Sequence, residues 1–493
     1  MKKIYIIVLV AFGIISCSDW LDVQPKTAIP GDKLFESEAG FKDVLTGFYL
    51  KMESENLYAK ELTYGYLELL SGNYDNYPGF KSLDKTQMYE YDGLYLDLKN
   101  RIYLEMYNII ANINNFLKYL EKNRSVVKTK HYYEMMKGEA LGLRAFLHFD
   151  LLRLFGPVYS ANSSEKTIPY RNTFDDVATS RLTADQVITS VLADLEEAYT
   201  LLEQHDPRNF GYPDLLNSNY NAFENQRQLR MNVYAVKALM ARVYCYRGDE
   251  ASREKAVQCA QEVIAAPHFK LCTSNTTLVL YEEHIFGLNV YELNKLIDTY
   301  FSDNELSGFV WDHTFILEEN FNSLYDFLAG GATDFRAQSK AFKSVMMNGK
   351  VYKYCRKYNQ SGYADEYSGK NIVPLIRLSE MYYIIAECES DKAKSAEALN
   401  NVRWKRGISY TDEILPDDSY DLPDTRSGYD PTQTVRINEI MKEYRKDFYA
   451  EGQLFYFYKH RDYKTFAGCP ISDVRGKYQW TVPDNEIIFG NNK

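Results

Sequence analysis

Small residues at helical spacing flank a turn in the segment between Asn232 and Ala266. On the two sides of the turn they are Ala235, Ala238, Ala241, Ala256 and Ala260. Residues three or four apart share one face of a helix, and small side chains on that face let two helices approach closely. Arg247-Gly248-Asp249 supplies the turn, and Pro267 ends the second stretch. The pattern predicts two helices packed as a pair, which restricts this part of the chain to helix-on-helix packing.

The same organisation recurs elsewhere. A second pair is predicted from Leu375 to Arg406, with its turn at Ser390-Asp391-Lys392. Single amphipathic helices are predicted over 137–154 and 185–202. Such pairs follow the packing logic of tetratricopeptide repeats, although the loop near Gly248 is looser than that repeat's usual spacing.

The C-terminal part of the chain carries one further long helix pattern. It begins near Thr434 and contains Gly452 internally. Strand signals are sparse, and the best candidates are the short runs 276–280 and 350–354. The sequence therefore predicts a mainly α protein with few short strands and irregular loops.

The N-terminal segment predicts export and lipid attachment. Two lysines precede an apolar run that ends at Ile15, and Ser16 is the small residue that a signal peptidase needs before its cut. The run is shorter than the roughly 20 apolar residues of a membrane-spanning helix. Removal of residues 1–16 would leave Cys17 as the new N-terminus, where bacterial lipoprotein maturation attaches acyl chains, and residues 17–35 as a tether. The alternative is an ordinary secretory signal followed by a chance cysteine.

Composition excludes several classes of function. The net charge is −11 and the pI is about 5.4, whereas nucleic-acid binding needs clustered Lys and Arg. The six cysteines after Cys17 form no CxxC pair, and none sits near a His at zinc spacing. Cys245, Cys259 and Cys388 lie among apolar residues in helical patterns and are expected to be small core residues. The sequence therefore predicts no nucleic-acid partner, no metal site and no cofactor.

The chain also lacks the motifs of common enzymes. It contains no GxSxG elbow, no HExxH, no Walker-type glycine loop and no EF-hand string. Glu282-Glu283 and Glu318-Glu319 invite comparison with a glycosidase pair, but neighbouring positions in a helix do not point together. His148, inside a helix pattern, is expected to be a core histidine. We therefore expect a protein that is not an enzyme.

Aromatic residues gather in three long segments that lack a regular pattern. The chain has 43 tyrosines, and the aromatic-rich segments are 72–97, 206–225 and 300–315. Exposed tyrosine offers a flat amphipathic surface on which a sugar ring or a peptide stacks at low entropic cost. Long irregular segments are usually functional or disordered. Most of the tyrosines must nevertheless fill the core.

Five short strings along the chain are informative together. They are Cys17-Ser18-Asp19-Trp20-Leu21-Asp22 and the segments 106–113, 139–146, 375–382 and 399–403. In residues, order and spacing they resemble the CxDxLD, YxxIxxAN, EAxxLRAF, LRLAEVYL and LNxVR motifs of the SusD/RagB family, the surface lipoproteins of glycan-utilisation systems in Bacteroidetes. The resemblance covers nearly the whole chain after residue 16.

The C-terminal signature of that family is present in altered form. The residues that match its ER…EG pattern are Glu443, Arg445, Glu451 and Gly452. Leu454 and Phe457 stand where members usually carry an Arg and an Asp. An ion pair that is lost as a whole can be replaced by apolar side chains without loss of stability. We therefore expect this region to be repacked rather than disrupted.

The resemblance implies a SusD-like fold of tetratricopeptide-like helix pairs that supports a loop-rich ligand-binding face. It implies a helical region over 36–270 and a C-terminal SusD/RagB region over 271–493. Family members sit over a SusC-like TonB-dependent transporter in the outer membrane, capture an oligosaccharide and deliver it. The implied protein is a surface-exposed, non-catalytic lipoprotein. Alternatives are a relative that binds peptide, or a protein-interaction scaffold of the same fold without glycan binding.

The resemblance also indicates a ligand surface. In the family it comes partly from the loop after the first helices and partly from the C-terminal half, which correspond here to 72–97 and 300–315. Aromatic rings flanked by amides and carboxylates suit sugar hydroxyls. The expected ligand-binding residues are Asn73, Tyr74, Asp75, Tyr77, Tyr91, Trp311 and Asp312. The alternative interpretation is that these side chains only pin loops to the scaffold.

Overall fold

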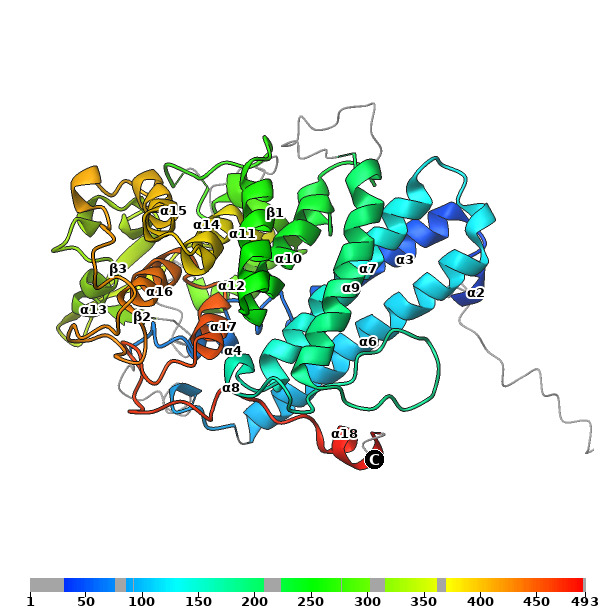
Figure 1. Cartoon of the computed structure of the whole chain (residues 1–493), viewed down its shortest axis with the longest axis horizontal. Helices are drawn as coiled ribbons and strands as arrows, with labels where there is room; N and C mark the ends of the chain where they lie inside the picture. Colours follow the sequence, from blue (N-terminus) through cyan, green and yellow to red (C-terminus); the bar gives the residue numbers. More distant parts are fainter. Residues whose placement is uncertain are drawn as a thin grey trace, which may run out of the picture.

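A computed structural model describes residues 31–75, 86–91, 93–207, 223–275, 277–301, 315–360 and 369–490 of the chain (Figure 1). Its helices are α2 (Gly31–Leu34), α3 (Glu38–Met52), α4 (Tyr66–Leu69), α6 (Leu94–Lys122), α7 (Tyr132–Phe155), α8 (Tyr159–Asn162), α9 (Ala184–His205), α10 (Val233–Arg247), α11 (Glu250–Ile264), α12 (Leu293–Phe301), α13 (Glu318–Leu324), α14 (Leu378–Cys388), α15 (Lys392–Lys405), α16 (Val435–Asp447), α17 (Gln453–His460) and α18 (Asp484–Phe489). Its strands are β1 (His284–Asn289), β2 (Phe315–Leu317), β3 (Phe342–Met347), β4 (Lys350–Cys355) and β5 (Ile372–Arg377).

Eight helices form a row in which each packs against the next. In order they are α3, α6, α7, α9, α10, α11, α14 and α15, running from the blue end of Figure 1 to the yellow end. The pairs α10–α11 and α14–α15 are those predicted from the sequence, and the prediction of a mainly α protein built on helix pairs is confirmed. Within the described residues, none of the helices is long and apolar enough to cross a membrane.

Local chemistry explains the pair α10–α11. The side-chain oxygen of Asn232 accepts hydrogen bonds from the first amides of α10. Gly248 follows α10 with a φ of 75°, a left-handed conformation that favours glycine, and Asp249 then caps α11. A link this short makes the two helices antiparallel, and the alanines predicted to face inward are buried.

Two predicted helices have different bounds in the structure. Leu375 belongs to β5 rather than to a helix, because 372–377 pairs antiparallel with β1 and is buried along its whole length. The long C-terminal helix is two helices, α16 and α17, separated at Gly452, whose φ is 69°. A Cβ at Gly452 would lie 2.7 Å from the carbonyl oxygen of Leu62, so the backbone contact requires glycine there.

The strand predictions succeed only in part. The run 350–354 lies in β4, whereas 277–280 is not a strand and Thr276 lies outside the described residues. The strands form two small antiparallel sheets, β1–β5 and β2–β4–β3. The altered signature is repacked as expected: Leu454 and Phe457 are buried, and the Phe457 ring stacks on Tyr444 with centroids 4.5 Å apart.

A buried network of charges joins the C-terminal elements. Asp447, the last residue of α16, forms ion pairs with Arg336 at 3.3 Å, Arg377 at 3.6 Å and Arg406 at 3.0 Å. Burial alone would raise the pKa of Asp447, but these three guanidinium groups hold it well below its usual range. A buried carboxylate with three cationic partners is stable only while every partner stays in place.

The network continues into neighbouring elements through shared partners. Glu283, just before β1, pairs with Arg377 at 3.0 Å and with Arg406 at 2.5 Å. Arg377, the last residue of β5, also pairs with Glu451 at 3.0 Å. The network therefore fixes the β1–β5 sheet relative to α15, α16 and the segment that leads into α17.

Glu68 of α4 connects the start of α17 to the segment that follows α4. Its Oε2 accepts from the amide of Gly452 at 3.0 Å, and its Oε1 accepts from the Asn73 side chain at 3.3 Å. Although these hydrogen bonds favour the carboxylate, burial outweighs them and raises the pKa of Glu68 to about 7.

The network predicts a large effect of a single uncharged substitution. Asp447→Asn keeps the shape of the side chain but leaves three arginines without their shared carboxylate. We expect a loss of about 3–5 kcal/mol in the free energy of unfolding, measured by denaturant titration at pH 7. Asp176→Asn, at an exposed position, is the matched control and should change stability little. Equal stability of the two variants would contradict this account.

The raised pKa of Glu68 predicts a pH dependence of opposite sign to that of ordinary acid denaturation. The folded state keeps its proton up to about pH 7, whereas the unfolded chain releases it near 4.5. The contribution of the Glu68 side chain to the free energy of unfolding is therefore complete below pH 4.5 and is lost as the pH rises to 7. Relative to Glu68→Gln, the wild-type protein should lose roughly 2.5 kcal/mol between pH 5 and pH 8. Parallel pH profiles of unfolding would refute the assignment.

Candidate functional site

The two segments predicted to bind ligand meet at Asp75. The backbone amide of Asp75 donates to the carbonyl oxygen of Phe315 at 2.8 Å. Its carboxylate accepts from the Leu317 amide at 2.6 Å and from the Asn320 side chain at 2.7 Å. The start of the first segment is therefore bonded to β2 and to the start of α13, although some 240 residues separate them.

Asp75 is placed so that it can accept a further hydrogen bond. Its side chain is half-buried, and this burial raises its pKa even though the bonds from Leu317 and Asn320 favour the charge. Each carboxylate oxygen has lone pairs for more than one donor. A carboxylate held by two internal donors offers the remaining positions in a fixed direction, as a sugar hydroxyl or a peptide amide requires.

Asn73 and Tyr74 make internal contacts. Asn73 is 2 % exposed; it donates to Glu68 and accepts from Arg445 Nε at 3.1 Å. Tyr74 is 3 % exposed, with its ring edge-on to Tyr449 at 5.5 Å between centroids. In this arrangement they hold the segment against α4 and α16. Direct contact of either with a ligand stays a prediction, and it would require the segment to move.

Tyr91 packs in a different aromatic cluster. It is half-buried, with Tyr89 at 6.3 Å and Trp480 at 6.1 Å between ring centroids, and Lys99 Nζ lies 5.1 Å from its ring centroid. These contacts join the segment after α4 to the C-terminal segment near Trp480. The remaining predicted residues Tyr77, Trp311 and Asp312 lie outside the described residues, so their contribution also stays a prediction.

The sheet β2–β4–β3 forms the adjoining part of this face, and the sequence reasoning identified only β4. Phe315, Tyr352 and Tyr354 make a small apolar cluster of their own on this sheet. Asn348-Gly349, with φ of 49° and 75°, connects β3 to β4. This dipeptide between alternating residues is a strong hairpin signal that would have identified the missed strand β3.

The acidic pair Glu282-Glu283 does not form two facing carboxylates. Glu283 is buried in the charge network, whereas Glu282 pairs with Lys270 at 3.2 Å on the surface. Glycoside hydrolysis needs two carboxyl groups that face one bond. His148 is fully buried, its ring nitrogens contact two backbone groups, and burial lowers its pKa to about 3, as expected of a core histidine.

An aromatic groove lies elsewhere in the molecule, against α6. It has a volume of about 520 Å³, and its lining includes Tyr103, Tyr107, Phe174, Asp175 and Asn485. Tyr103 is buried, whereas Tyr107 is half-buried. Phe174 belongs to the connection between α8 and α9, and this connection lies far from β2 and β3 in Figure 1.

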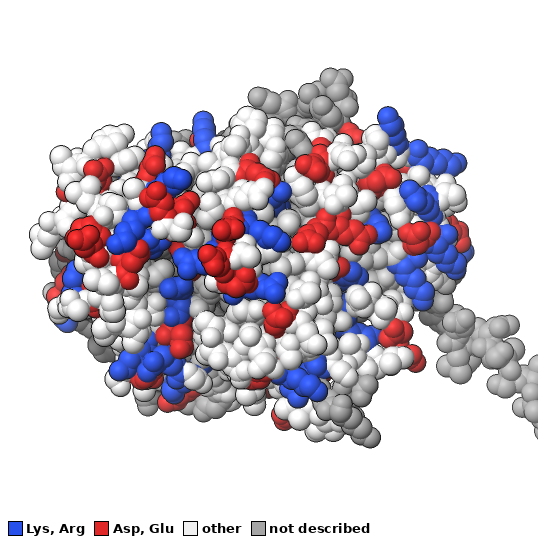
Figure 2. All heavy atoms as spheres, viewed as in Figure 1, with Lys and Arg blue, Asp and Glu red and all other residues white. Residues whose placement is uncertain are grey.

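Figure 2 shows acidic and basic side chains interspersed over the face in view.

Comparison with known proteins gives two family matches. Residues 19–209 match a family described as starch-binding and associating with the outer membrane, and residues 300–458 match the SusD family. The SusD-like protein P38 of Formosa agariphila is 28 % identical over 207 residues, which is 40 % of this chain and 38 % of that protein. The match therefore spans well under half the length of this curated relative.

Solved structures share the fold over nearly the whole chain. A SusD superfamily protein from Bacteroides fragilis superposes with a TM-score of 0.67 at 21 % identity, covering 93 % of this chain and 99 % of that one. A putative sugar-binding protein from Bacteroides vulgatus gives a TM-score of 0.66 at 20 % identity, covering 92 % and 97 %.

At such low identity these structures establish the fold alone, while the sequence matches extend over both the N-terminal and the C-terminal parts of the chain. The fold is that of SusD-family carbohydrate-binding proteins, a family associated with the outer membrane. Taken together, the helix row, the two family matches and the shared fold show that the chain belongs to the SusD/RagB family.

Proposed function

We propose that this protein captures an oligosaccharide at the cell surface and delivers it, chemically unchanged, to a SusC-like TonB-dependent transporter of the outer membrane. The observation that carries the proposal is the junction at Asp75, where the two segments assigned to the ligand surface are bonded together on one face. Membership of a family described as starch-binding supports the choice of a carbohydrate.

The binding surface would combine a fixed acceptor with aromatic platforms. Asp75 would accept from a sugar hydroxyl while its internal donors keep it in place. Tyr77 and Trp311 would stack on the sugar rings, with Asp312 and Tyr91 as flanking groups and Asn73 and Tyr74 as their support. Because α4, α16 and β2 hold the described part of this face, little ordering entropy would be lost on binding.

The lipid anchor would serve the transfer step. Acyl chains on Cys17 would hold the protein to the outer membrane, and residues 17–35 would act as the tether. Two proteins confined to one membrane meet at a high effective concentration, so delivery would not need a tight contact with the transporter. Peptide cargo, or a scaffold without glycan binding, remains the alternative, and the binding experiment separates it from the proposal.

Replacement of the proposed aromatic platform should weaken glycan binding without unfolding the protein. We expect Trp311→Ala to weaken the affinity for a bound neutral oligosaccharide at least tenfold, which corresponds to about 1.4 kcal/mol. Tyr74→Ala should also weaken binding, through loss of support for the segment. The measurement is isothermal titration calorimetry with a panel of neutral oligosaccharides, with circular dichroism to confirm the fold.

Phe174→Ala is the matched control because Phe174 is a partly exposed aromatic in the groove against α6. It should leave the affinity unchanged. If Phe174→Ala abolishes binding and Trp311→Ala does not, the ligand surface is the α6 groove and our assignment is wrong. If the wild-type protein binds peptides but no saccharide of the panel, the glycan proposal itself fails.

Substitution of the proposed lipidation site should release the protein from the membrane. Cys17→Ala should lose incorporation of labelled palmitate and move from the membrane fraction to the soluble fraction on ultracentrifugation. Cys469→Ala, at a half-buried cysteine far along the chain, should keep both properties. Membrane retention of Cys17→Ala with undiminished palmitate labelling would rule out this anchor.

A further inference from the structure

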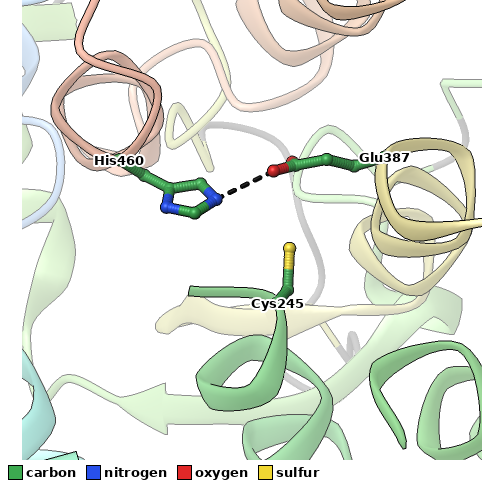
Figure 3. Close-up of side chains that lie close together, drawn as sticks. All are labelled: Cys245, Glu387 and His460. Carbon is green, nitrogen blue, oxygen red and sulfur yellow. Dashed lines mark hydrogen bonds and ion pairs between the residues drawn. The ribbon is translucent and has the colours of Figure 1, made fainter. Parts of the chain in front are cut away.

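Three side chains with metal-binding atoms converge near the end of α17. Cys245 on α10, Glu387 on α14 and His460 on α17 place their ligand atoms within 4.8 Å of one another (Figure 3). His460 Nε2 lies 2.8 Å from Glu387 Oε1. In Figure 3 the thiol, the carboxylate and the imidazole point toward a common space between three helices.

The protein shields this space but leaves it within reach of solvent. Cys245 and Glu387 are buried, and the His460 side chain is 14 % exposed. All three residues line a small cavity of about 50 Å³. Glu387 also lines a surface groove of about 700 Å³, whose walls include the exposed Glu250 and Glu254. A small ion could therefore reach the cluster through the groove.

The donor set matches one class of ion. Thiolate, imidazole and carboxylate are the ligands of Zn²⁺, which takes three protein ligands and a water when its site stays open. Bond lengths of 2.0–2.3 Å place tetrahedral donors roughly 3.5 Å apart, so a set already within 4.8 Å needs only small side-chain adjustments. Calcium and magnesium prefer sites made of oxygen ligands alone.

The charges of the donor groups themselves suit a divalent cation. The Glu387 carboxylate already pairs with His460 Nε2 at 2.8 Å. Arg461 lies 3.5 Å from Glu387, and Cys388 neighbours Cys245. On binding, the Cys245 thiol would lose its proton to solvent as the sulfur–metal bond forms, and thiolate plus carboxylate would balance the two charges of the ion.

We propose that Cys245, Glu387 and His460 form a zinc site that fastens α17 to α10 and α14, with a water from the groove as the fourth ligand. Such a site would join helices that lie far apart in sequence, and it would stabilise the folded state by an amount that grows with the logarithm of the free zinc concentration above the dissociation constant. The inference is independent of the proposed glycan binding, and its failure would leave that proposal intact.

Cobalt tests the site because a thiolate bound to Co²⁺ gives a charge-transfer band in the near ultraviolet. The full-length protein in detergent is reduced, stripped with a chelator and titrated with Co²⁺. We expect one equivalent to produce the thiolate band together with the strong visible bands of tetrahedral cobalt, and Zn²⁺ to abolish both. Absence of the thiolate band from the reduced wild-type protein overturns the proposal.

Variants assign the ligands. Cys245→Ser should lose the thiolate band, whereas Cys388→Ser, which removes the neighbouring thiol, should keep it. The reverse result overturns the proposal, as does a band that persists in Cys245→Ser. If Cys245→Ser fails to fold, His460→Gln at the partly exposed end of α17 provides the test. It should weaken zinc binding at least tenfold in a chelator competition, and unchanged affinity overturns the site.

Discussion

The carboxylate of Asp447, surrounded by Arg336, Arg377 and Arg406 in the protein interior, is the interaction on which the C-terminal half depends. A buried charge is tolerable only when it is paired, so these side chains fix one another and the elements that carry them. The β1–β5 sheet, α15 and α16 thereby adopt one arrangement. Glu451, which pairs with Arg377 in this network, is followed in the chain by Gly452. The amide of Gly452 donates to Glu68, and Glu68 holds the segment that contains Asp75.

The proposed ligand face therefore rests on structure that is held from both sides. The helix row supplies apolar packing that extends through α14 and α15, and the charge network connects that row to α16 and α17. For the proposed capture of a ligand a rigid base is an advantage, because a preorganised surface loses less conformational entropy on binding. Binding specificity can then vary through the loops while the scaffold stays the same.

The parts of the fold that local pattern controls were predictable. Helix spacing, the Asn232 cap and the turn at Gly248 are properties of neighbouring residues, and the pair α10–α11 follows from them. β5 was misassigned because a short apolar run is compatible with either a buried strand or a helix, and only pairing with β1 decides. The same limit applies to Asn73 and Tyr74: their residue types suit a ligand surface, yet their partners Arg445 and Tyr449 keep them buried.

By itself, the sequence determined a helical scaffold and a family resemblance that the comparisons confirm. It also predicts an exported and lipid-anchored N-terminus, which stays an expectation. Only the tertiary structure decided which distant side chains meet. Asp75 contacts β2, and Cys245 lies beside Glu387 and His460, across separations that no spacing rule covers. The physical reason is that periodicity acts over a few residues along one element, whereas a site is assembled by the packing of several elements.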